Sequence, residues 1–145
     1  MSEQVLEKEF PGLTSSNYRI TSDLTGEYNC IAWAANETDV WWEPDPYDLY
    51  FWPPGIQRTY TLDAYINAYG TLGYTTCEDT EYEEDYEKIA IYLDSDETPT
   101  HAARQLDSGN WTSKLGSLED IEHNSLDDII CYEYGSSVVV MKRPK

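Results

Sequence analysis

Short apolar stretches separated by polar turns run along this chain, and their spacing changes near its middle. Residues 30–35 form an apolar stretch behind Asn29, a favoured N-cap, and this predicts a helix that ends near Asn36. Residues 61–72 predict a second helix, because their apolar side chains recur at helical spacing behind Thr61, which can cap it. The first half of the chain is therefore expected to supply the helices.

The second half reads mainly as strands. Strands are predicted at residues 74–77, 88–93, 100–106, 111–115 and 136–141, where apolar residues alternate or run together. The turn at residues 107–110 predicts a tight hairpin. A capping-box pattern at 117–120 predicts a short helix to residue 122 or 123, followed by a helical turn within 124–130. Helices followed by an antiparallel sheet indicate the α+β class.

Two segments stand outside this regular pattern. Residues 1–16 are expected to be an extended lead-in, and residues 17–145 a single domain. Residues 40–55 hold three of the five Trp and four of the seven Pro, which predicts an aromatic loop without regular structure. Its rings are expected to cover the core, and they can also wall a substrate cleft.

The net charge of the chain indicates which classes of partner it can bind. The 145-residue chain has a formal net charge of −19 and a pI near 4.1, so its surface repels nucleic acid and anionic membranes and attracts basic proteins. An acidic decoy for a nucleic-acid-binding site is the alternative, although the charge is not confined to one block. With no signal-peptide pattern and no long apolar run, the expected location is cytoplasmic.

The three cysteines, Cys30, Cys77 and Cys131, argue against a disulfide framework, because their number is odd. No CxxC pair occurs and the spacing of His101, His123 and the carboxylates indicates no metal site, so no metal or other cofactor is expected. Cys30 differs from the other two because it opens a predicted helix. The helix dipole lowers the pKa of such a thiol, and a distant His101 at the head of a strand can act as its base.

Three segments carry a resemblance to known families: residues 28–34, residues 101–106 and residues 111–116. A Cys at a helix start after Asn, followed by a His at a strand start, resembles the NlpC-type branch of the papain-like cysteine hydrolases. The same segments resemble a family of uncharacterised small bacterial proteins. The first resemblance implies a papain-like α+β fold and a third polar residue on the strand after the histidine.

Ser113 is the best candidate for that third residue. The hairpin about residues 107–110 places residues 113–116 opposite His101, and alternation puts Ser113 on one face with Trp111 and Leu115. Its hydroxyl departs from the His, Asn, Asp or Glu usual at this place in the family. Asp120 or Glu119 could supply a carboxylate instead if the chain turns back.

The first hypothesis, which the resemblance implies, is a small cysteine hydrolase or acyl-transferase: a peptidase, amidase or deamidase that works by acyl transfer. His101 would deprotonate Cys30, and the thiolate would attack the carbonyl of a peptide or amide substrate, with the backbone N–H of Cys30 stabilising the oxyanion. Candidate substrate-binding residues are Tyr28, Asn29, Trp33 and Lys114. The second hypothesis is a non-enzymatic acidic binding or inhibitor protein that engages a basic partner through its aromatic residues.

Overall fold

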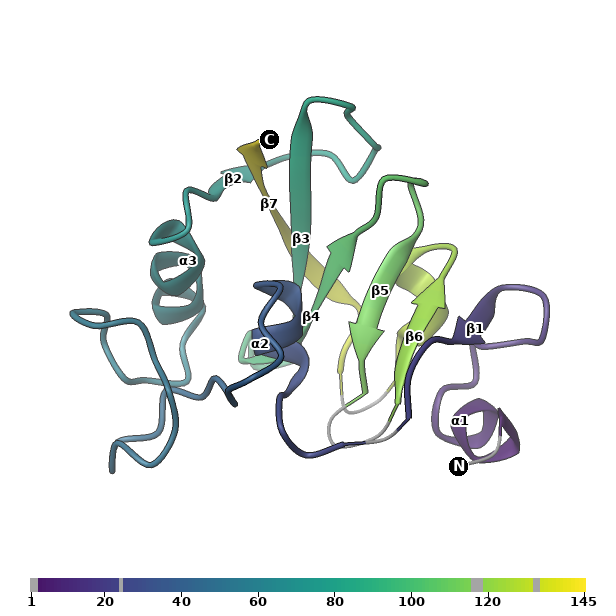
Figure 1. Cartoon of the computed structure of the whole chain (residues 1–145), viewed down its shortest axis with the longest axis horizontal. Helices are drawn as coiled ribbons and strands as arrows, with labels where there is room; N and C mark the ends of the chain where they lie inside the picture. The colour runs from purple at the N-terminus through teal and green to yellow at the C-terminus, as the bar shows by residue number, and fades with distance from the viewer. Residues whose placement is uncertain (1–2, 24, 116–118, 132–133) are drawn as a thin grey trace.

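A seven-stranded antiparallel sheet forms the centre of the protein (Figure 1). The computed structural model describes residues 3–23, 25–115, 119–131 and 134–145. Its elements are α1 (Glu3–Glu9), β1 (Tyr18–Ile20), α2 (Cys30–Ala34), α3 (Leu62–Gly70), β2 (Thr75–Cys77), β3 (Tyr86–Leu93), β4 (Pro99–Gln105), β5 (Trp111–Lys114), β6 (Asp120–His123), the 3₁₀ helix η1 (Leu126–Ile129) and β7 (Ser137–Pro144). The strand order is β1-β6-β5-β4-β3-β7-β2, and each recorded pairing between these strands is antiparallel. The predicted α+β class is confirmed.

Both predicted helices form, and each is capped by the expected residue. The Asn29 side chain accepts a hydrogen bond from the Ala32 amide at the start of α2, and Thr61 accepts one from the Ala64 amide at the start of α3. Such a cap satisfies a backbone donor that the first turn of a helix leaves unpaired. No helix in the described part of the chain is long and apolar enough to cross a membrane.

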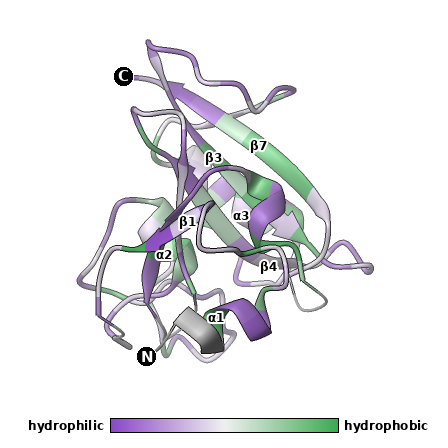
Figure 2. Cartoon of the chain, turned by 90° about the vertical axis from the view of Figure 1, so that its right-hand side faces the viewer, coloured by the Kyte–Doolittle hydropathy of each residue, from purple (hydrophilic) through white to green (hydrophobic). Residues whose placement is uncertain are grey.

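The sheet has two buried faces, and strand alternation assigns each side chain to one of them. On one face Ile89, Ile91 and Ala102 pack with α2 and α3. On the other face Ala90, Tyr92, Ala103, Trp111 and Ile121 pack with residues from α1 and η1. Figure 2 shows the hydrophobic middle of β7 between more polar ends. Because both faces are covered, the buried apolar residues of β3, Ile89–Leu93, and of β4, Ala102 and Ala103, point to both sides of the sheet.

The structure differs from the predicted elements at three places. Part of the expected lead-in is the helix α1, and its Leu6 side chain is fully buried in the second face's core. The helix expected up to residue 122 or 123 is wrong over 120–123, which form β6; residues 117 and 118 lie outside the described residues. Pairing with β5 overrides the local capping pattern there. The three-residue β1 was not predicted, because it is too short for a periodic signal.

Candidate functional site

Cys30 opens α2 as expected, but the residue is buried against β4. The residue is 8% exposed and belongs to the core between α2, α3 and the sheet. Burial raises the pKa of the thiol to about 11, and hydrogen bonds from the amides of Ala102, Ile31 and Cys30 itself offset this only in part. The expected lowering of the pKa is therefore not found: a five-residue helix does not compensate the loss of water around the sulfur.

His101 lies on the other face of the sheet. Its ring stacks on Tyr134 at a centroid distance of 4.3 Å and meets Tyr92 edge-on at 5.3 Å. The next residue along β4, Ala102, faces α2 and packs in the core that contains Cys30. The prediction that the sulfur and the imidazole share one crevice is wrong, because successive residues of a strand point to opposite faces.

The expected contact between His101 and Ser113 is present. His101 Nε2 lies 3.0 Å from Ser113 Oγ, and that hydroxyl lies 2.8 Å from His123 Nε2. His123 Nδ1 lies 2.8 Å from the Ser125 carbonyl oxygen, which can only accept, so Nδ1 carries the proton and Nε2 accepts from Ser113. His101 Nε2 then donates to Ser113. The result is one hydrogen-bonded chain between two neutral imidazoles.

This chain of polar groups is buried in the protein core. His101, Ser113 and His123 are all fully buried, and burial lowers the pKa of both histidines. His101 Nδ1 is buried without a hydrogen-bond partner in the described part of the chain. The hydrogen bonds of His101 there include neither Asp120 nor Glu119, the proposed alternative carboxylates. The geometry therefore supplies a structural polar link between β4, β5 and β6.

Two of the candidate substrate-binding residues hold the start of α2 in place. Asn29 donates from Nδ2 to the Trp42 carbonyl at 2.7 Å, and its Oδ1 accepts from the Trp42 amide at 3.0 Å. Trp33 Nε1 donates to Thr112 Oγ1 at 3.0 Å, which fastens α2 to β5. Both side chains have their polar groups engaged inside the fold.

The other two, Tyr28 and Lys114, meet in a second polar cluster on the α2 face. Lys114 Nζ donates to the Thr25 carbonyl at 2.8 Å and lies 5.3 Å from the centre of the Tyr28 ring. The Tyr28 hydroxyl donates to Asp120 at 2.7 Å, and burial together with that carboxylate raises the pKa of Tyr28 to about 12. These groups link β5 and β6 to the segment before α2.

Exposed apolar side chains gather on one segment, residues 41–60, here called the aromatic loop. It carries five of the six large hydrophobic side chains recorded as exposed in the described chain: Tyr47 (80%), Leu49 (73%), Tyr50 (43%), Phe51 (42%) and Tyr60 (45%). The loop projects away from the sheet in Figure 1. Trp42 and Trp52 instead turn inward and are buried against Tyr65 and Tyr69. The expected covering of the core thus holds for these two Trp rings, while the tip faces solvent.

Arg58 braces the aromatic loop from inside. Its guanidinium donates to the Asp45 carbonyl and carboxylate, both at 3.0 Å, to Asp48 at 2.6 Å and to the Tyr50 carbonyl at 3.0 Å. The Asp45 carboxylate also accepts from the amides of Leu49 and Tyr50. Burial acts to raise the pKa of Asp45, but these amides and Arg58 outweigh it and lower the pKa. Sequence reasoning found the loop and missed Arg58, whose signal was a lone cation in an acidic aromatic segment.

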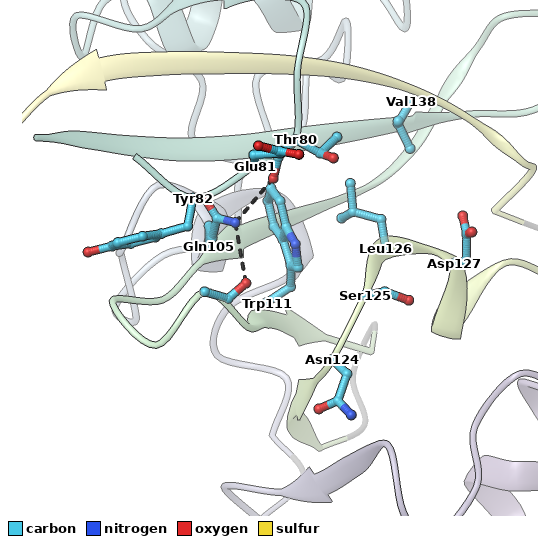
Figure 3. A pocket seen from close by; sticks show the side chains of 11 residues that line it. Thr80, Glu81, Tyr82, Gln105, Trp111, Asn124, Ser125, Leu126, Asp127 and Val138 are labelled. Atoms are coloured by element: carbon cyan, nitrogen blue, oxygen red, sulfur yellow. Dashed lines mark hydrogen bonds between the residues drawn. The ribbon is translucent and has the colours of Figure 1, made fainter. Parts of the chain in front are cut away.

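Two hollows in the protein surface are candidates for a ligand-binding site. A pocket of about 280 Å³ is lined by residues of the aromatic loop, among them Trp41, Glu43 and Tyr60, together with Cys30 and Tyr65. A larger one, of about 590 Å³, lies on the face that holds His101 and is shown in Figure 3. No cysteine or histidine lines the larger hollow, and Gln105 closes one wall by donating to the Thr80 and Gly109 carbonyls. Each hollow is lined by one exposed aromatic side chain, Tyr82 in the larger and Tyr60 in the smaller, and only the smaller is lined by residues of the aromatic loop.

Comparison with known proteins gives a family and no function. Neither curated proteins nor solved structures show a match, so the papain-like topology has no structural support. No group of three His, Cys, Asp or Glu side chains among the described residues is placed to hold a metal ion. A family model described as a domain of unknown function, DUF7689, matches residues 19–142. This chain therefore belongs to the DUF7689 family.

Proposed function

We propose that this protein is a non-enzymatic acidic binding protein that engages a basic protein partner through the aromatic loop. The observation that carries the proposal is the gathering of exposed Tyr, Phe and Leu side chains on one braced, acidic segment. Aromatic residues are enriched at protein interfaces and supply most of the energetic hot spots there. Such a patch on a monomer surface indicates an interaction site.

The loop is held in one shape before any partner arrives. Trp42 and Trp52 are buried in the core and anchor the loop there. Arg58 donates hydrogen bonds to Asp45, Asp48 and the Tyr50 carbonyl. A segment that is already ordered loses less conformational entropy on binding, so more of its contact energy appears as affinity. This bracing distinguishes the aromatic loop from a merely disordered apolar tail.

The negative charge of the chain favours a partner with a basic surface. The chain's formal net charge is −19, and exposed Glu37 and Asp39 precede the loop. Within the loop, Arg58 is occupied by Asp45 and Asp48. A strongly acidic protein attracts a basic surface over long range, and this attraction accelerates association. A partner with clustered Lys and Arg fits this surface, whereas nucleic acid does not.

The hydrolase hypothesis lacks its base in this geometry. Cys30 and His101 occupy opposite faces of the sheet, and burial raises the pKa of the thiol to about 11. A thiol nucleophile needs a base within hydrogen-bond reach or a lowered pKa. The absence of both from Cys30 favours the binding hypothesis.

The proposal is tested with arginine- and lysine-rich peptides, each paired with the same peptide in which glutamine replaces every cation. Fluorescence anisotropy at low and high salt measures their binding to the full chain. We expect salt-dependent binding of the basic peptides that falls by about tenfold or more in a Tyr47→Ser, Leu49→Ser double variant. Tyr82→Ser, which removes an exposed ring outside the loop, is the matched control and keeps its binding. Equal binding by the wild type and the double variant would overturn the proposal.

A further inference from the structure

The smaller of the two pockets has the composition of a cation receptor. Trp41, Glu43 and Tyr60 line it from the aromatic loop, Tyr65 from α3, and Cys30 from the first turn of α2. Trp41 and Tyr60 both contact the Glu43 carboxylate, and Trp42 and Tyr65 line the same pocket. The face of an aromatic ring attracts a cation, and the attraction is stronger where water is partly excluded.

Glu43 is positioned by the same rings that would contact a ligand. Its Oε1 accepts from Trp41 Nε1 at 3.1 Å, and its Oε2 accepts from the Tyr60 hydroxyl. A carboxylate has about four lone-pair positions, so roughly two remain for a ligand. The half-buried carboxylate is therefore oriented and still able to accept.

No cation within the described part of the chain forms an ion pair with Glu43. The nearby Arg58 is instead engaged by Asp45 and Asp48. Its negative charge acts on its neighbour: the hydrogen bond to Glu43, and then burial, raise the pKa of Tyr60 to about 12. The pocket is thus anionic and aromatic-walled, and it is lined by residues of the same loop that carries the exposed tip.

The thiol of Cys30 completes the wall as a neutral group. With its pKa raised to about 11, it is uncharged at neutral pH and adds a small apolar surface beside Tyr65. An ammonium ion keeps a strong hydration shell, whereas a guanidinium is planar, more weakly hydrated, stacks on aromatic rings and presents two parallel donors to a carboxylate. The flat aromatic walls and the two free acceptor positions favour the guanidinium.

We infer that this pocket receives an arginine side chain of the basic partner, which stacks between the Trp41 and Tyr60 rings and donates to Glu43. The inference rests on the proposed function and names the residue that the same surface selects. The bound guanidinium replaces the intramolecular cation that Glu43 lacks. Arginine recognition is then the specificity-determining contact, and the tip residues Tyr47 and Leu49 add apolar area around it.

The test uses one arginine-containing basic peptide and two derivatives, with citrulline or lysine at every arginine. Citrulline keeps the shape of arginine without its charge. We expect the arginine peptide to bind about tenfold or more tightly than the citrulline peptide, and Glu43→Gln to remove that difference. Glu84→Gln removes an equal charge from an exposed position outside the pocket and the aromatic loop, and is expected to change binding by about twofold or less. Circular dichroism and thermal melting establish that each variant is folded.

Two further outcomes make the test decisive. If Glu43→Gln fails to fold, Tyr60→Leu is used instead, because it removes one wall of the pocket at an exposed position. It is expected to weaken binding of the arginine peptide and to leave binding of the citrulline and lysine peptides unchanged. Equal binding of the arginine and citrulline peptides, or of the arginine and lysine peptides, overturns the arginine assignment. Binding that depends on Tyr47 and Leu49 but not on Glu43 rejects this inference and keeps the proposed function. Binding that depends on none of them rejects both.

Discussion

Arg58 holds Asp45 by two hydrogen bonds of 3.0 Å, one to the carboxylate and one to the backbone carbonyl of the same residue. Both ends of the exposed turn at residues 45–50 are thereby fixed to one guanidinium, which also donates to the Tyr50 carbonyl. Only the forked geometry of arginine satisfies these acceptors together. The shape of the aromatic loop thus depends on one side chain.

Replacing Arg58 distinguishes the effect of the loop's shape on peptide binding from the effect of its charge. Arg58→Ala makes the loop more acidic, so charge alone would strengthen binding of a basic peptide. We expect binding to weaken by about fivefold or more, because the freed loop must be ordered on association. Hydrogen exchange at the Leu49 and Tyr50 amides, now bonded to Asp45, is expected to accelerate. Stronger binding by Arg58→Ala would show that charge, and not loop shape, governs recognition.

Cys30 is expected to be unreactive in the folded protein. With a pKa of about 11, almost none of the thiol is ionised at neutral pH, and the residue is only 8% exposed. Iodoacetamide labelling at pH 7, followed by mass spectrometry, is expected to modify Cys30 far more slowly in the folded than in the urea-unfolded chain. His101→Gln is expected to leave the Cys30 rate unchanged if the variant stays folded. Rapid labelling of Cys30 that slows in this variant would restore the hydrolase hypothesis.

Stability is expected to fall as pH drops below about 6.5, the usual pKa of histidine. Burial lowers the pKa of His101 and of His123, while the Ser125 carbonyl, Asp128 and Glu122 partly oppose this at His123. The unfolded chain then binds more protons than the folded chain, so the stability present above pH 6.5 is lost as pH falls toward the lowered values. Each histidine contributes a slope of at most about 1.4 kcal/mol per pH unit.

Urea unfolding between pH 7.5 and pH 5.5 measures this slope above the range in which most carboxylates titrate. His123→Gln removes one of the two titrating groups and is expected to reduce the slope to about half. A wild-type slope of zero over this range would show that the two imidazoles are not held neutral in the folded state.

The Ser113 hydroxyl is expected to stabilise the fold rather than support catalysis. Ser113→Ala leaves two buried imidazole nitrogens without their shared partner. We expect a loss of about 1–3 kcal/mol in the free energy of unfolding, measured by urea denaturation. The exposed Ser15→Ala is the matched control and is expected to change stability by less than about 0.5 kcal/mol. An unchanged Ser113→Ala would mean that the hydroxyl contributes nothing net to stability.

Local chemistry was sufficient to predict much of the fold. Asn29 and Thr61 cap α2 and α3 as expected, and the turn at 107–110 joins β4 to β5. Helix caps and tight turns depend on residues within a few positions of one another, so the sequence contains their cause. The contact between His101 and Ser113 was predictable for the same reason, because a short hairpin sets the register of its two strands and so brings side chains on one face, directly opposite or diagonal, within reach of each other.

Other features depended on partners far along the chain. The capping-box pattern before residue 120 suggested a helix, yet β6 forms because Asp120–His123 pairs with β5 on one side and β1 on the other. The helix α1 lies where an extended lead-in was expected, and burial of Leu6 in a core built by distant strands accounts for its position. Pairing and burial of this kind outweigh weak local preferences.

The sequence by itself determined the α+β class, the capped helices, the hairpin and the acidic, aromatic character of the surface. Only the tertiary structure decided the site. It placed Cys30 and His101 on opposite sides of the sheet, and it brought Arg58 against Asp45 within the aromatic loop. The physical reason is that a shift of one residue along a strand reverses the direction of a side chain, and the cover on each face comes from segments far apart in the sequence.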